Sequence, residues 1–122
     1  MQADDRKRTA LNFLRSARIG DRIGAREYVT PNARHHNPYF AKGMTTLLDA
    51  ITAAATPERV TDIKRVLCDG DIVAVHSHVR QRPGDSGAAV VHLFRFEGDK
   101  IAELWDVGQP VPVDNPNADG MF

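Results

Sequence analysis

Residues 60–107 have the sequence VTDIKRVLCDGDIVAVHSHVRQRPGDSGAAVVHLFRFEGDKIAELWDV. Three turn signals, DGD, RPGDSG and EGDK, divide it into four runs rich in β-branched and aromatic residues. Connections this short join strands that run in opposite directions. The stretch therefore predicts four consecutive strands in an antiparallel meander.

The residues before this stretch have the periodicity of helices. Apolar side chains recur at helical spacing in residues 4–19 and again in residues 44–56. Between them, residues 21–29 predict a shorter helix with Asp21 as its N-cap. Residues 30–43 are rich in Pro, Asn and Gly, which predicts a loop. Helices followed by a meander predict an α+β fold in which the helices cover the concave face of a curved sheet and leave a pocket.

Length, charge and cysteine content limit the function classes. A chain of 122 residues forms one core, so we expect residues 1–122 to be a single domain. Its 16 basic and 16 acidic residues give a formal net charge of zero, which argues against nucleic acid or an anionic membrane as a partner. A single cysteine and the lack of a long apolar run predict a cytoplasmic protein.

Alternation along the predicted strands places the histidines and the last carboxylate. Residues two apart share a strand face, so His76 and His78 point the same way. His92 lies among apolar side chains on its strand. On the last strand Trp105 and Asp106 are expected on opposite faces. A bulge would change the alternation of side chains along this strand.

Several segments together resemble the SnoaL-like branch of the nuclear transport factor 2-like superfamily. They are RHHNP, LCDGDIVAVHSHVR, VVHLFRFEGDKIAELWDVGQPVP and the terminal NADGMF, and the resemblance runs from about Tyr28 to Phe122. It implies an α+β cone of helices packed on a curved, mainly antiparallel sheet. It also implies a pocket for a small-molecule ligand or substrate and a homodimer formed through the outer face of the sheet.

The resemblance also implies a chemistry and a set of site residues. SnoaL-like polyketide cyclases need no cofactor and close a ring by intramolecular aldol condensation, using a pocket carboxylate as acid and base. Asp106 best matches this carboxylate, with His92 and His36 as the other catalytic residues. The residues expected to bind substrate are Asn37, Tyr39, His76, His78, Phe94 and Trp105. Relatives commonly carry His before the Trp, where this chain has Leu104.

The residue types suit that chemistry. A base that removes a proton from a carbon between carbonyls needs a pKa near the working pH, which a carboxylate reaches by desolvation or a neighbouring like charge. The enolate then needs hydrogen-bond donors already in place, and the imidazoles and the Asn37 amide can supply them. The sequence leaves two function classes open: a cyclase or isomerase acting on a small apolar carbonyl compound, or a non-catalytic small-molecule binding module of the same fold.

Structural alternatives exist for the same residues. Asp106 could accept backbone N–H groups at the strand end, and His92 could be a core histidine with one satisfied nitrogen. With Asp106, the strand histidines His76, His78 and His92 include the ligand types of a metal site. The chain has neither a Cys partner nor an HExxH helix, so we predict no metal and no cofactor.

Overall fold

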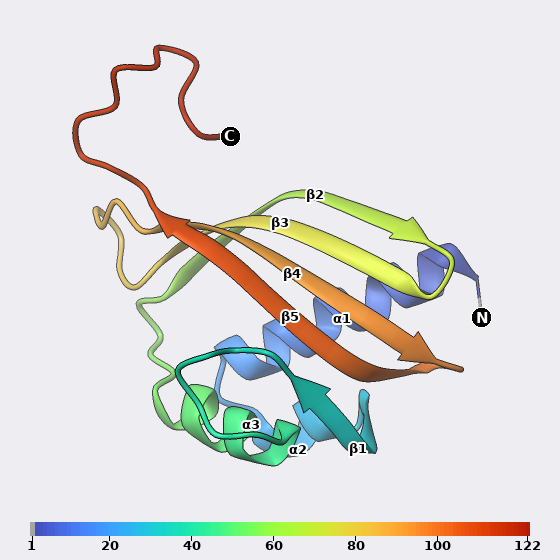
Figure 1. Ribbon diagram of the computed structural model, residues 1–122. Helices are drawn as coiled ribbons and strands as arrows, with labels where there is room; N and C mark the ends of the chain where they lie inside the picture. The colour runs from blue at the N-terminus through green and yellow to red at the C-terminus, as the bar shows by residue number, and fades with distance from the viewer. Residues whose placement is uncertain (1) are drawn as a thin grey trace.

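The computed structural model describes residues 2–122, which form helices packed on one mixed β-sheet (Figure 1). The elements are α1 (Ala3–Arg18), α2 (Arg22–Arg26), β1 (Val29–His35), α3 (Met44–Ala53), β2 (Val60–Asp69), β3 (Ile72–Arg80), β4 (Ala88–Glu97) and β5 (Lys100–Pro110). The N-cap of α2 is the predicted one, since the Asp21 carboxylate accepts the Gly24 N–H at 2.9 Å. The predicted order of helices and meander strands is confirmed.

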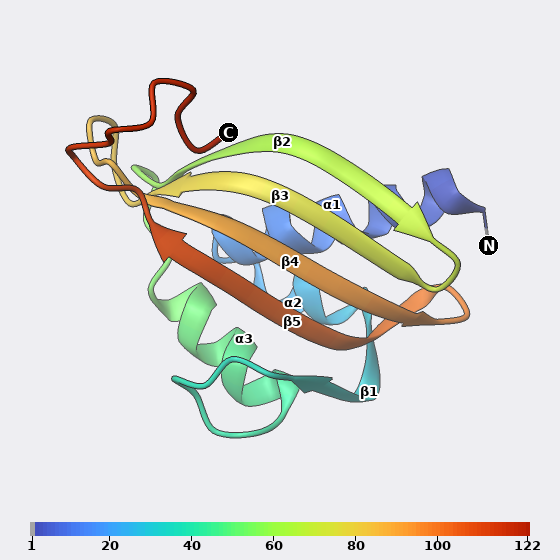
Figure 2. The same cartoon turned by 45° about the horizontal axis from the view of Figure 1, so that its top comes forward.

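The five strands lie in the order β1-β5-β4-β3-β2. Strands β2 to β5 form the predicted antiparallel meander, with each strand paired to the next along the chain. The sheet curves without closing, and α1 lies across its concave face against β2 and β3 (Figure 2). The fold is therefore the expected α+β cone, open at one edge.

The prediction of a loop over residues 30–43 is wrong for its first part. Strand β1 pairs in parallel with β5, with Val29 opposite Ile101 and His35 opposite Leu104. The pairing continues just beyond the strand, where the His36 N–H donates to the Leu104 carbonyl at 2.9 Å. Local composition favours a turn, but β5 offers an unpaired edge, and tertiary pairing outweighs the local preference.

The hydrophobic core lies between the concave face and the helices. Phe13 of α1 meets Phe94 of β4 edge to face, with ring centroids 5.7 Å apart, and both side chains are almost completely buried. Leu47 and Leu48 of α3 belong to the same core. Each such side chain stabilises the fold by roughly 1.5–3 kcal/mol through burial. This packing fixes the position of α1 relative to the strands.

A bulge interrupts the alternation of β5. Arg95 of β4 lies opposite Glu103, but the next residue, Phe96, lies opposite Ile101, so Ala102 is the extra residue. Because of this extra residue Ile101 and Glu103 lie on opposite faces although they are two positions apart, and Ile101 belongs to the core on the concave side. Residues after the bulge regain the alternation.

Candidate functional site

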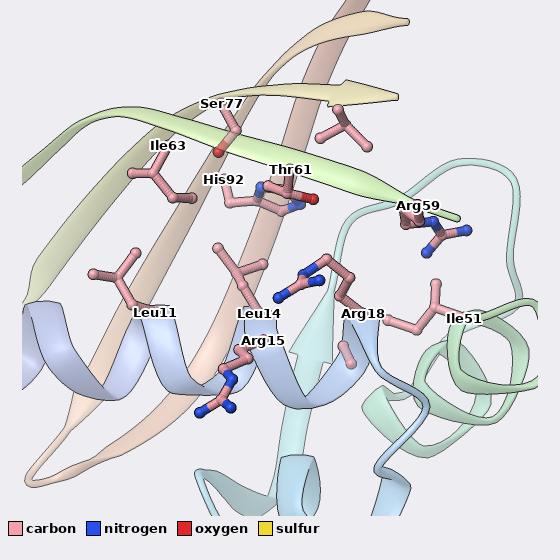
Figure 3. A pocket seen from close by; sticks show the side chains of 12 residues that line it. Leu11, Leu14, Arg15, Arg18, Ile51, Arg59, Thr61, Ile63, Ser77 and His92 are labelled. Atoms are coloured by element: carbon pink, nitrogen blue, oxygen red, sulfur yellow. The ribbon is translucent and has the colours of Figure 1, made fainter. Parts of the chain in front are cut away.

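A cavity of about 300 Å³ lies between the C-terminal half of α1 and the concave face of the sheet (Figure 3). We call it the helix-side cavity. Its lining residues are Leu11, Leu14, Arg15, Ala17, Arg18, Ile51, Arg59, Thr61, Ile63, Ser77, Val79 and His92. Figure 3 shows Leu11 and Leu14 reaching up from the helix toward the strands that carry Ser77 and His92. The walls are apolar, with polar groups at only a few points.

His92 of β4 lies on the sheet side of this cavity. Its cross-strand neighbours are Val75 and Asp106. The ring stacks beside Phe94 at 6.1 Å, and its Nδ1 is buried with no hydrogen-bond partner among the described residues. Burial lowers the pKa of His92 to about 4, although the Asp106 carboxylate acts in the opposite direction. The imidazole is therefore neutral at pH 7.

Ser77 of β3 is a second polar group without a partner on the concave face. It is fully buried, and its Oγ makes no hydrogen bond within residues 2–122. A buried hydroxyl without a partner costs about 1–3 kcal/mol, so such a group calls for a specific reason, for example an ordered water or a ligand in the adjoining cavity. Ser77 is not among the site residues predicted from the sequence. The sequence feature that could have identified it is a single hydroxyl on a strand face that it shares with Val73 and Val75.

Asp106 lines a second hollow, next to the first. This hollow has a volume of about 500 Å³ and includes the loop residues Asn37, Pro38 and Tyr39. The Asn37 side-chain amide donates to Asp106 Oδ2 at 2.9 Å, and Asn37 Oδ1 accepts the Tyr39 N–H at 2.9 Å. Asp106 lies opposite His92 on the neighbouring strand, so the pair places one lining residue of each hollow side by side. We call the two hollows together the concave-face site.

Of the predicted site residues, the structure brings His92, Asp106 and Asn37 together. Tyr39 is exposed on the rim of the second hollow. Phe94 is fully buried in the core and lines neither hollow. The remaining predicted residues lie on the convex face of the sheet.

His36 and Trp105 are neighbours on the convex face. Their rings stack at 5.0 Å and 6° from parallel, and His36 Nε2 lies 2.5 Å from Glu103 Oε2. Glu103 is buried and also accepts hydrogen bonds from Arg34 and Arg95. The hydrogen bond from His36, followed by that from Arg95, lowers the pKa of Glu103. His36 is therefore held by Glu103 and does not lie with Asp106.

His76 and His78 do share a strand face, as predicted, but it is the convex one. Strand β3 places Val75 opposite His92, so His76 points to the other side of the sheet, and the prediction that it faces the pocket is wrong. His76 Nδ1 lies 2.6 Å from Arg65, and His78 Nε2 lies 2.8 Å from the Ser86 carbonyl. The Phe122 ring stacks on His78 at 4.6 Å. Homodimer formation through this face stays a prediction.

Across residues 2–122, no group of three or more His, Cys, Asp or Glu side chains is arranged to hold a metal ion. No helix in the same part of the chain is long and apolar enough to cross a membrane.

Comparison with solved structures identifies the fold class as nuclear transport factor 2-like. An NTF-2 like protein of unknown function from Burkholderia xenovorans LB400 superposes with a TM-score of 0.75 at 13% identity, covering 93% of this chain and 88% of that one. A "putative ketosteroid isomerase" from Kribbella flavida DSM 17836 gives 0.75 at 14% identity, with 94% and 85% covered. A "putative polyketide cyclase" from Sinorhizobium meliloti gives 0.68 at 22% identity, with 88% and 100% covered.

Sequence comparison narrows the class to a family. The model of the SnoaL-like domain matches residues 11–104, so the chain belongs to the SnoaL-like family. The match includes His36, Asn37, Ser77 and His92 and ends two residues before Asp106. No curated protein sequence matches the chain.

Proposed function

We propose that this protein is a cofactor-free cyclase or isomerase that performs aldol-type acid/base chemistry on a small apolar carbonyl compound. The observation that carries the proposal is the adjacent pair of Asp106 and His92 on the concave face. Each residue of the pair lines one of two adjoining hollows. A carboxylate and a neutral imidazole in one apolar site are the groups needed for moving a proton from carbon.

Asp106 is the proposed base. The Asn37 amide holds Oδ2, which leaves Oδ1 to take the proton from a carbon next to a carbonyl. The C–H electron pair moves into the carbonyl and forms an enolate. The enolate carbon attacks a second carbonyl carbon of the same molecule, and the proton returns from Asp106 to the resulting alkoxide. In an isomerisation the proton returns to a different carbon.

His92 is the proposed partner of the enolate oxygen. Because its pKa is about 4, it is neutral at pH 7 and offers one N–H donor rather than a positive charge. A donor fixed in an apolar cavity before the reaction stabilises the developing negative charge without reorganising. The cavity walls also fold the substrate so that the reacting carbons meet.

Family membership and fold support the proposal. The family is SnoaL-like, and structures of the same fold include proteins named as a "putative polyketide cyclase" and a "putative ketosteroid isomerase". Both names describe chemistry that begins with proton removal next to a carbonyl. The position of the Asp106–His92 pair gives this chain the groups for such a step.

Deuterium exchange tests the proposal without knowledge of the natural substrate. Ethyl benzoylacetate is incubated in D₂O, and loss of the proton signal between its carbonyls is followed by NMR at a pD where exchange with buffer is slow. We expect the protein to accelerate exchange and Asp106→Asn to lower the accelerated rate by about 10²–10⁴-fold, the usual contribution of a positioned base.

The matched control is Asp99→Asn, which removes an exposed carboxylate from the β4–β5 turn. It is expected to exchange at the wild-type rate. Exchange by Asp106→Asn at the wild-type rate would eliminate Asp106 as the base. Binding of the ester without any acceleration by the wild-type protein would favour the binding module.

A further inference from the structure

The helix-side cavity has a basic rim. Its lining includes Arg15, Arg18 and Arg59 and no acidic residue. The whole chain has a formal net charge of zero, so this concentration of positive charge is local. The two groups on the sheet side of the cavity, His92 and Ser77, are neutral and lack partners for Nδ1 and Oγ among the described residues.

The three arginines are not equivalent. Figure 3 shows the Arg18 guanidinium pointing into the cavity toward His92, whereas Arg15 points away from the sheet. Arg18 makes no hydrogen bond or ion pair in residues 2–122, although salt bridges engage several other arginines. Arg59 donates two hydrogen bonds to the Gln81 amide oxygen, at 3.3 and 3.2 Å. Neither Arg18 nor Arg59 is neutralised by an acid there.

Helix electrostatics explain only part of this arrangement. Arg18 lies in the last turn of α1, where positive charge is favoured by the helix dipole. Arg59 belongs to the segment before β2, so the dipole of α1 gives no reason for its position. Two guanidinium groups from separate elements, at the edge of an apolar cavity, are the arrangement that binds a carboxylate in protein sites.

We propose that the helix-side cavity binds an apolar carboxylic acid that carries a second oxygen far from its carboxylate. The carboxylate lies between Arg18 and Arg59, and the apolar body lies along Leu14 and Ile51. The second oxygen reaches the unpartnered groups of Ser77 and His92. A volume of about 300 Å³ is at the small end for ligand sites, which selects a small acid.

The inference rests on the proposed function, because it makes the second oxygen the reacting carbonyl. The ligand class is then a small keto acid whose carbonyl lies beside the Asp106–His92 pair. The carboxylate anchors the substrate at the rim and orients it, so that its binding energy positions the reacting carbon.

Three probes of equal chain length test the anion and the second oxygen separately. They are octanoate, octanol and the oxo-octanoate with its carbonyl at the penultimate carbon, each titrated into the full chain labelled with ¹⁵N and ¹³C. We expect octanoate to shift the His92 ring signals and octanol to bind at least about tenfold more weakly, since hydrogen bonds to charged groups are worth roughly 1.5–3 kcal/mol. The oxo-acid is expected to bind more tightly than octanoate.

Arg18→Gln and Arg15→Gln remove the same charge from neighbouring positions of one helix. Arg18→Gln is expected to weaken octanoate binding about tenfold and to leave octanol binding unchanged. Arg15→Gln is expected to change octanoate binding by less than about threefold, because its guanidinium points away. Equal weakening by both variants, or equal binding of octanoate and octanol, would overturn the carboxylate site.

Ser77→Ala tests the far end of the ligand. It is expected to remove the advantage of the oxo-acid over octanoate while octanoate binding is retained. An unchanged advantage would remove Ser77 from the site, and an oxo-acid that binds no better than octanoate would overturn the second contact. Thermal unfolding of each variant checks that it folds.

The outcomes are separable from those of the exchange experiment. One outcome is that octanoate binding depends on Arg18 but the wild-type protein does not accelerate deuterium exchange. This outcome would support the carboxylate site and contradict the proposed enzymatic activity. The opposite outcome is that deuterium exchange depends on Asp106 but neither octanoate nor the oxo-octanoate binds. This outcome would support the proposed enzymatic activity and contradict the keto-acid inference.

Discussion

The convex face of the sheet and the helix-side cavity use histidine in opposite ways. On the convex face, His36, His76 and His78 each have a polar partner: Glu103, Arg65 and the Ser86 carbonyl. On the concave face, His92 has no hydrogen-bond partner for its buried Nδ1 within the described part of the chain. The convex histidines are held by the protein itself. The concave one keeps its hydrogen-bonding capacity free, which is what a ligand site requires.

Residue type alone therefore does not mark a site. All five histidines of the chain lie on or beside the same sheet, and every one except His92, His35 of β1 included, is engaged in hydrogen bonds within the described residues. A polar group that folding leaves unpaired is costly, so it is retained only where something else compensates for it. The pairing state of the histidines therefore separates the candidate site from the supporting structure.

The largest expected difference between the faces is in packing. Phe94 and Leu93 are adjacent in β4, but Phe94 is fully buried on the concave side and Leu93 is only partly buried on the other. We expect Phe94→Ala to lower the free energy of unfolding by about 3–5 kcal/mol, and Leu93→Ala by about 1–2 kcal/mol. Urea denaturation measures both. Equal losses would mean that the two faces are equally packed.

A second prediction concerns pH. Folded protein keeps His92 neutral down to about pH 4, whereas the unfolded chain takes up this proton near pH 6.5. Between these values the unfolded state binds more protons, so the free energy of unfolding falls as the pH is lowered, by up to about 3 kcal/mol in total. Above pH 6.5 the residue contributes no pH dependence.

Urea denaturation across this range, repeated with His92→Gln, measures the contribution of His92. The variant is expected to lose the pH dependence above pH 4.5. His78→Gln on the convex face is the matched control and should retain it. A wild-type-like pH profile in His92→Gln would show that burial of His92 is not its source.

The smallest effect is expected at Glu103. Its carboxylate accepts hydrogen bonds from Arg34, Arg95 and His36 on the convex side. We expect Glu103→Gln to lower the free energy of unfolding by about 1–2 kcal/mol, because those charged donors lose a charged acceptor. Its lowered pKa means that Glu103 stabilises the fold above pH 4.5 and loses this effect as the pH falls further.

Glu103→Gln also tests on which face of the sheet the reaction takes place. We expect it to leave the Asp106-dependent exchange of ethyl benzoylacetate unchanged, since Glu103 points to the opposite face. A large loss of exchange in a stably folded Glu103→Gln protein would place the reaction on the convex side, with His36. That result would contradict the proposal that Asp106 and His92 form the reaction site on the concave face.

Much of the fold could be predicted from the sequence. The helix predicted over residues 44–56, which is found as α3 (Met44–Ala53), and the meander strands follow from periodicity and turn residues, because their signals are local. Strand β1 could not be predicted in this way: its sequence VTPNARH contains turn formers, and its hydrogen bonds come from β5, about 70 positions away. The bulge at Ala102 depends on the register between two strands, which composition does not encode.

The site was predictable only in part. The family motifs led to Asp106, His92 and Asn37, which the structure does place together. Alternation could tell that His76 and His78 share a face but not which face the helices cover. Ser77 and Arg18 were missed because their significance lies in the partners they lack, and this becomes visible only when the chain is folded.

The parallel pairing of β1 with β5 has a consequence for the order of events during synthesis. Asn37 and Asp106, joined by a hydrogen bond, are 69 positions apart in the chain. As the ribosome releases the N-terminal part first, the helices and β1 emerge well before the strand that pairs with β1. The second hollow therefore takes shape only when the last strand has left the ribosome, and until then the edge of β1 is open to chaperones or to a neighbouring nascent chain.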